Sequence, residues 1–204
     1  MRSVHQSMTL DIRAAVAAER RDQAELLSGL THQQWDAPSL CEGWSVKHVV
    51  AHTTLPFRSS VKRVLVETLK SAGRFNHASD RMARADARTC STSDLLDALK
   101  ANIDHPWTPP GGGPEGALSH DVIHGLDITV ALGLDRKVPA DRLSIVLGGV
   151  KPGHIRYFGA DLKGKRLEAT DLDWTFGEGT PVRGEAQDLL LLVCGRRLPP
   201  GRLS

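Results

Sequence analysis

Helical spacing of apolar residues is clearest in the middle of the chain, in the segment 117–133 (ALSHDVIHGLDITVALG). Its apolar residues share one face when the segment is wound as a helix: Leu118, Val122, Leu126, Val130 and Leu132. Because an apolar face of this width is normally buried, we expect this helix to pack against several others. Gly133 offers it a C-terminal stop.

The same spacing predicts helices on both sides of this segment, separated by stretches rich in turn-forming residues. These helices are expected at about residues 9–30, 45–65, 91–103, 139–147 and 183–195. Ser45 is the expected N-cap of the second, and Gly195 is expected to end the last. Residues 72–90 are polar and lack a clear period, which predicts a loop or a short helix there.

The pattern changes after Gly159. The segments RLEATD (166–171) and DWTFGEG (173–179) alternate apolar and polar residues, which is typical of short strands. Helices followed by strand, strand and helix predict a mainly α protein. We therefore expect a helical bundle at residues 1–158 and a small α+β domain at residues 159–204.

Three local features carry further expectations. Pro56 lies four residues after His52 and cannot donate a hydrogen bond to its carbonyl, which predicts a kink or break beside that histidine. The charged run at 19–22 is expected to be a solvated face. The proline- and glycine-rich segment 105–116 cannot be regular, and it is either a linker or the rim of a pocket.

Composition and charge exclude several classes of protein. The 204 residues include 26 basic and 24 acidic ones spread along the chain, which argues against an electrostatic nucleic-acid footprint. No run approaches the roughly 18 apolar residues of a membrane span, and the first residues lack the apolar stretch of a signal peptide. Three cysteines without paired spacing fit a reduced compartment, so we expect a cytoplasmic protein.

Histidines supply the candidate chemistry. His120 and His124 are four positions apart, so both imidazoles leave the same face of the central helix. With His52 from a second helix they give three protein nitrogens and one open position, the layout of a catalytic zinc site. His48 is a rival for the first ligand. Asp127 is expected to orient an imidazole, whereas Asp121 is expected to point to solvent or to cap a helix.

Other readings of the reactive residues are less well supported. A Ser/His/Asp hydrolase lacks the G-x-S-x-G turn. A nucleophile built on Cys41 stays open, although nothing in SLCEGW lowers a thiol pKa. The remaining histidines have no local partner pattern and are expected at the surface: His5, His32, His77, His105 and His154.

Three motifs in order carry a family resemblance: WDAPSLCEGWSVKHVVAH (35–52), HDVIHGLDITVALG (120–133) and VRGEAQDLLLLVCGRR (182–197). Together they resemble the mycothiol-dependent maleylpyruvate isomerase family, within the DinB-like superfamily of metal-binding four-helix bundles. The resemblance implies a divalent metal, usually zinc, bound by residues matching His52 and His124. In that family the middle ligand is a glutamate, at the position where this chain has His120. The three ligand atoms here would therefore all be nitrogens. Arg196 matches an arginine implicated in the isomerases.

The leading hypothesis is an enzyme, acting as a monomer or homodimer, that uses a divalent metal to activate a low-molecular-weight thiol. The resemblance implies mycothiol as that thiol. A metal-bound thiol is deprotonated and attacks a small electrophile, giving isomerisation or S-transfer. Arg196 would bind a carboxylate of the substrate or thiol. Two alternatives remain open: a thiol-independent metal hydrolase, and a non-catalytic bundle that binds a metal or a small molecule.

Overall fold

The computed structural model describes the backbone of residues 2–204 and the side chains of residues 12–74 and 76–204. The helices are α1 (Arg2–Ser28), α2 (His32–Asp36), α3 (Val46–Thr53), α4 (Leu55–Arg58), α5 (Val61–Lys70), α6 (Phe75–Thr89), α7 (Thr92–Lys100), α8 (Gly113–Thr129), α9 (Ala140–Gly148), α10 (Pro152–Phe158) and α11 (Ala186–Val193). The strands are β1 (Lys165–Ala169), β2 (Thr175–Gly177) and β3 (Thr180–Gly184).

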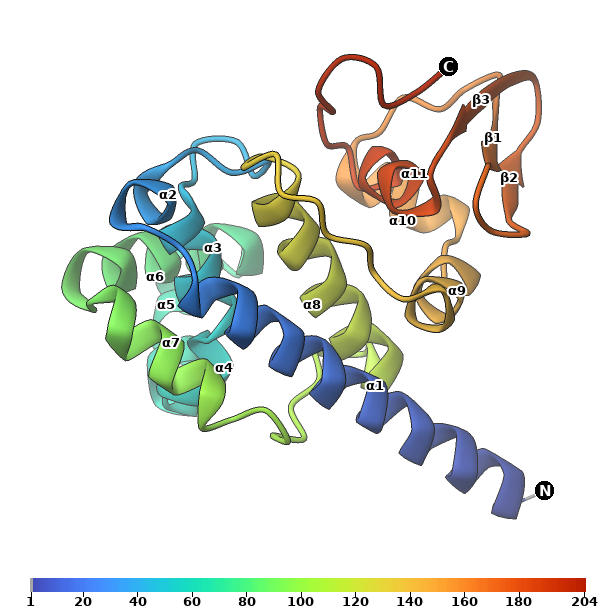
Figure 1. Cartoon of the computed structure of the whole chain (residues 1–204). Helices are drawn as coiled ribbons and strands as arrows, with labels where there is room; N and C mark the ends of the chain where they lie inside the picture. The colour runs from blue at the N-terminus through green and yellow to red at the C-terminus, as the bar shows by residue number, and fades with distance from the viewer. Residues whose placement is uncertain (1) are drawn as a thin grey trace.

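Long helices form a bundle in which α8 is central (Figure 1). Helix α1 packs along α8 and also contacts α7, while α3 packs against α6, α7 and α8. On α8 the predicted apolar face is buried, and Leu118, Val122 and Leu126 have no exposed surface. Full burial of each such side chain stabilises the fold by about 1.5–3 kcal/mol, so the apolar pattern of α8 fixes its place in the bundle.

The C-terminal segment folds as a small sheet covered by α11. Strand β1 lies between its two partners, antiparallel to β2 and parallel to β3. Leu167 of β1 packs against Leu189 and Val193 of α11. The fold is therefore mainly α with a small three-stranded C-terminal sheet, as expected from the sequence. Strand β3 was not predicted, because it is short and carries Pro181, which is tolerated in an edge strand.

Two predictions of secondary structure are wrong. Residues 72–90 contain the long helix α6, whose inward residues are mostly alanines and therefore give a weak apolar signal: Ala78, Met82, Ala83 and Ala87. The predicted helix at 45–65 is divided into α3, α4 and α5. The first of these divisions is the expected break: α3 ends at Thr53, and Pro56 lies in the short helix that follows.

The charged run at 19–22 is also not a solvated face as a whole. Glu19 and Arg20 are buried, because each is paired with opposite charge across a helix interface, whereas Arg21 is exposed. Other expected features agree with the structure: Ser45 precedes α3, Pro139 precedes α9, and Gly195 ends α11 with a positive φ of 72°. Within residues 2–204, no helix is long and apolar enough to cross a membrane.

Candidate metal centre

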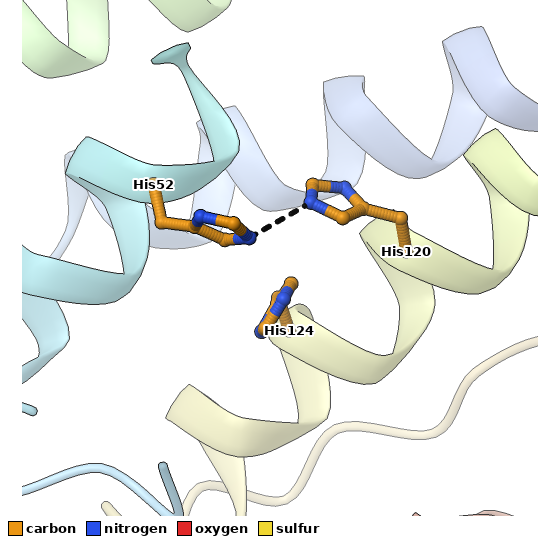
Figure 2. A group of neighbouring side chains, drawn as sticks. All are labelled: His52, His120 and His124. Atoms are coloured by element: carbon orange, nitrogen blue, oxygen red, sulfur yellow. Dashed lines mark hydrogen bonds between the residues drawn. The ribbon is translucent and has the colours of Figure 1, made fainter. Parts of the chain in front are cut away.

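Three histidines lie together where α3 faces α8 (Figure 2). His52 comes from the last turn of α3, and His120 and His124 come from consecutive turns of α8. One ring nitrogen of each lies within 4.8 Å of one ring nitrogen of the other two. The Nε2 atoms of His52 and His120 are 3.2 Å apart. The structure thus brings together the three residues that the sequence proposed as metal ligands.

The second ring nitrogen of each histidine contacts a different side chain. The pairs are His52 Nδ1 with Ser79 Oγ at 3.0 Å, His120 Nδ1 with Asp121 Oδ1 at 2.9 Å, and His124 Nδ1 with Asp127 Oδ2 at 3.0 Å. An ionised carboxylate only accepts hydrogen bonds, so each aspartate fixes the proton on Nδ1, and a serine hydroxyl can accept in the same way. Each Nε2 then presents a lone pair, as metal-binding histidines do.

Burial favours the neutral form of His52 and His124. Burial lowers the pKa of His52 well below its usual value, and the neighbouring His124 and His120 lower it further. Burial also lowers the pKa of His124, although its hydrogen bond to Asp127 opposes the shift. Neutral imidazole is the form that coordinates a metal, so the environment prepares these residues for that role.

These donors fit zinc. Zinc–nitrogen bonds of about 2.0–2.1 Å in tetrahedral geometry place two ligand nitrogens roughly 3.4 Å apart. The 3.2 Å between the Nε2 atoms of His52 and His120 is close to that separation. Three ligand nitrogens also leave a fourth position for an exchangeable ligand, which separates a catalytic zinc site from a closed structural one.

Asp127 connects the histidines to the end of the chain. Its buried carboxylate accepts hydrogen bonds from Arg196 Nε at 2.7 Å and Arg196 Nη2 at 2.9 Å, in addition to its contact with His124. Burial alone would raise the pKa of Asp127, but Arg196 and His124 outweigh it and hold that pKa well below its usual range. Asp127 therefore lies beside His124 as a charged acceptor, where the sequence placed it.

Arg196 is engaged on all three guanidinium nitrogens. Besides the two bonds to Asp127, its Nη1 donates to the carbonyl of Cys194 at 3.1 Å. Burial would lower the pKa of Arg196, but Asp127 outweighs it and raises that pKa. With 18% of its side chain exposed, Arg196 is both a support for Asp127 and a cation at the border of the site. Its expected role in binding a carboxylate stays a prediction.

Cys41 lies at the same site but as a neutral thiol. Its Sγ donates to Asp127 Oδ2 at 3.0 Å and lies 3.8 Å from His124 Nδ1. Burial raises the pKa of the Cys41 thiol, and the charge of Asp127 raises it further. Since the thiolate is the reactive form, this geometry gives no support to a nucleophile built on Cys41.

The sequence misplaced Asp121 and did not find Ser79. Asp121 was expected at the surface or at a helix cap, and this is wrong: it is buried between His120 and Arg20, whose Nε donates to Asp121 Oδ2 at 2.7 Å. Ser79 was missed because its helix, α6, was missed. A charged residue directly beside a candidate ligand on an apolar helix was the signal that could have revealed Asp121.

The rival ligand His48 has a different role. Its Nδ1 lies 2.8 Å from Ser45 Oγ and 3.2 Å from the backbone nitrogen of Ser45. His48 thus folds back onto the first turn of α3 and supports the helix N-terminus. Within the part of the chain that the structure describes, it does not join the group formed by His52 and the two histidines of α8.

The remaining histidines lie mostly where the sequence expected them. His32, His77 and His154 are exposed, whereas His105 is half-buried and lies against Phe57 in a tilted arrangement with ring centroids 5.1 Å apart. The surface prediction for His105 is therefore wrong, since the 105–116 segment folds back onto the bundle. The side chain of His5 lies outside the described residues.

Aromatic rings flank the histidines on two sides. The ring of Trp44 lies 5.3 Å from that of His52, and the ring of Trp107 lies 5.2 Å from that of His120. Trp107 also lines a cavity of about 190 Å³ between α1, residues 103–108 and the start of α8. Of the two roles left open for the 105–116 segment, its first residues thus serve as the rim of a pocket, and Trp107 in that rim also contacts His120.

The first half of the chain is similar to a known protein family. Residues 16–106 match the model described as the mycothiol maleylpyruvate isomerase N-terminal domain. Residues 16–106 are therefore similar to the N-terminal domain of this family. The match contains His52 and ends before His120, so it covers the first helix of the histidine cluster and not the second.

Solved structures share the fold of almost the whole chain. A crystal structure of mycothiol-dependent maleylpyruvate isomerase superposes with a TM-score of 0.57 at 13% identity, covering 96% of this chain and 92% of the other. A histidine-to-alanine mutant of the mycothiol-dependent isomerase gives a TM-score of 0.53 at 12% identity, covering 93% and 90%. At this identity the likeness establishes the fold. No curated protein sequence gives a significant match.

Proposed function

We propose that this protein is a metal-dependent enzyme that activates a low-molecular-weight thiol, mycothiol, for isomerisation of a small electrophile or for S-transfer to it. The observation that carries the proposal is the cluster of His52, His120 and His124, each contacted at Nδ1 so that Nε2 can bind a metal. The family match and the shared fold support the choice of mycothiol.

His52, His120 and His124 are the proposed ligands, and zinc is the proposed metal. When bound, zinc lowers the pKa of a coordinated thiol and makes it a strong nucleophile at neutral pH. The chain's own side chains orient and shield this centre: the Nδ1 partners fix the three imidazoles, and Trp44 and Trp107 cover two of them. A low-water surrounding strengthens every electrostatic interaction inside it.

The cavity beside Trp107 is the proposed place for part of the small-molecule ligands. It lies against His120 through the Trp107 ring, and its walls are largely apolar with Arg13 and Asp104 among the lining residues. Beside Asp127, Arg196 is proposed to receive a carboxylate of the thiol or the substrate through the 18% of its side chain that is exposed, while its Nε and Nη2 keep Asp127 in place.

The metal is tested first, by elemental analysis of the purified protein. We expect about one zinc ion per chain, and loss of that zinc on changing His52, His120 or His124 to alanine, because each removes one of three ligands. His77→Ala, which removes an exposed histidine outside the cluster, is the matched control and should keep its zinc. Full zinc content in all three cluster variants contradicts the proposed centre.

The thiol is tested next, by following consumption of maleylpyruvate by the zinc-loaded protein with and without mycothiol. The proposal expects consumption only when the thiol is present, and its loss in the three cluster variants. Equal consumption without thiol replaces the proposal with a metal hydrolase. A protein that binds zinc but consumes no electrophile under either condition, with maleylpyruvate and with a general thiol-reactive probe, is a binding module instead.

A further inference from the structure

A buried arginine–aspartate pair contacts His120. Arg20 of α1 donates from Nε to Asp121 Oδ2 at 2.7 Å, and the second oxygen of Asp121 lies 2.9 Å from His120 Nδ1. Only 1% of the Arg20 side chain is exposed. Arg20 and Asp121 are 101 positions apart in the sequence, so the contact exists only because α1 packs along α8.

Stability alone is a poor explanation for this pair. Removing two charges from water costs several kcal/mol for each, and replacing a buried ion pair with apolar residues is often neutral or stabilising. Arg20 gains further contacts, since Nη1 donates to the carbonyl of His105 at 2.7 Å and the guanidinium lies 5.1 Å from the Phe57 ring centre. Its Nη2 nevertheless has no hydrogen-bond partner among the described residues.

The other histidine of α8 has the same arrangement from a different part of the chain. Arg196 donates from Nε to Asp127 Oδ1 at 2.7 Å, and Asp127 Oδ2 lies 3.0 Å from His124 Nδ1. Two Arg–Asp–His relays therefore converge on α8, one from α1 and one from the segment after α11. Repetition of one geometry at two adjacent histidines indicates a shared task rather than incidental packing.

We propose that Arg20 and Asp121 are positioning residues that fix the proton of His120 on Nδ1 and aim its Nε2 at the metal. This inference rests on the proposed metal site. Arg20 holds the carboxylate through one oxygen, and the other oxygen accepts the Nδ1–H of His120. A carboxylate hydrogen-bonded to a ligand histidine makes that imidazole more basic and lends the site negative charge. In this chain the carboxylate of Asp121 supplies the negative charge that a neutral histidine ligand lacks.

The test compares zinc affinity and the tautomer of His120 in the wild-type chain and in Asp121→Asn. Zinc affinity is measured by competition with a chromophoric chelator, and we expect it to fall about 10- to 100-fold in the variant. The tautomer is read from ¹⁵N chemical shifts of the metal-free protein, where the wild type should carry the His120 proton on Nδ1. An asparagine can turn its NH₂ toward Nδ1, so the variant should show a larger population protonated on Nε2.

A matched control separates positioning from general destabilisation. Asp86 is also buried and also accepts from an arginine, Arg58 Nη1 at 2.7 Å, and the described residues show no hydrogen bond from it to a histidine. Asp86→Asn should therefore lower the melting temperature without changing zinc affinity. Arg20→Gln removes the buried charge but keeps a donor, and its zinc affinity should also fall, which preserves the test should Asp121→Asn fail to fold.

The outcomes distinguish this inference from the function on which it rests. A wild-type protein that binds no zinc overturns the proposed function, while the tautomer measurement still decides whether Asp121 sets the state of His120. Unchanged zinc affinity in a folded Asp121→Asn or Arg20→Gln variant overturns the relay. An unchanged tautomer in Asp121→Asn, or an equal loss of zinc affinity in Asp86→Asn, overturns it as well.

Discussion

Individual side chains at the histidine cluster are oriented by partners that are themselves fixed. Asp121 and Asp127 each accept a hydrogen bond from an arginine and each contact one histidine of α8. In both cases the arginine holds the aspartate, and the aspartate holds the imidazole in its orientation. His52 differs, because its Nδ1 partner is the hydroxyl of Ser79. Supported side chains of this kind keep ligand atoms in place without a cost in rotamer entropy when a ligand binds.

Cysteine reactivity is the first prediction at this scale. At pH 8 in the native protein, iodoacetamide should label Cys41 and Cys194 slowly, whereas both should be labelled fully in urea. Burial raises the pKa of both thiols, that of Cys194 to about 12, so the reactive thiolate is scarce at pH 8. Mass spectrometry of tryptic peptides measures the labelling.

Cys41→Ser is the companion variant, because serine keeps a donor toward Asp127. It should retain zinc and thiol-dependent activity. Rapid native labelling of Cys41, or a folded Cys41→Ser protein that binds zinc but has lost all activity, assigns the nucleophile to the protein and contradicts the proposed use of an external thiol.

Helices differ in how well they can be predicted from the sequence. The pattern of α8 was sufficient to predict a buried helix with two histidines on one face, and Pro56 was sufficient to predict the break after α3. Helix α6 was not predictable in this way, since alanines fill a close helix contact without raising the apolar signal. Ser79 lies on α6, so its contact with His52 was not predicted either.

Pairs of residues that lie far apart along the chain could not be predicted from the sequence either. The pairing of Arg20 with Asp121 and of Arg196 with Asp127 depends on which helices become neighbours, and periodicity along one helix carries no information about that. The three ligand candidates could be proposed because two follow a spacing rule on α8 and the third, on α3, lies in a segment that resembles a family motif. Their supporting residues follow no local rule.

Glu19 carries the prediction at the scale of helix packing. Its buried carboxylate on α1 accepts from Arg136 Nη2 at 2.7 Å and from Arg142 Nη1 at 2.9 Å, which joins α1 to the connection before α9 and to α9 itself. Glu19→Ala should lower the free energy of unfolding by about 3–5 kcal/mol, because it leaves buried positive charge without its acceptor. Urea denaturation followed by circular dichroism measures the change.

Glu25→Ala is the control on the same helix, since Glu25 is exposed. Its effect should stay within about 0.5 kcal/mol, as for most surface substitutions. A Glu19→Ala variant as stable as Glu25→Ala shows that the buried network does not hold α1 to its neighbours.

The whole molecule joins the bundle and the C-terminal segment through one apolar core. Leu190, Leu191 and Cys194, in and directly after α11, pack in the same cluster as Leu126 of α8 and Leu147 of α9. The arginine after α11 adds a polar link by binding Asp127. The proposed division at residues 158 and 159 therefore describes two architectures that share an interface next to the histidine cluster.

This shared core predicts a single cooperative unfolding transition for the chain. Leu190→Ala removes a fully buried side chain where α11 meets α8, so it should cost about 2–5 kcal/mol and destabilise both parts together. Calorimetry should show one peak whose calorimetric and van't Hoff enthalpies agree, in the wild type and in the variant. Hydrogen exchange followed by mass spectrometry should show faster exchange in α8 as well as in α11.

As a control, Leu65→Ala truncates an exposed leucine of α5 and should leave both regions unchanged. Two separate transitions, or faster exchange confined to residues 159–204, show that the C-terminal segment folds independently of the bundle.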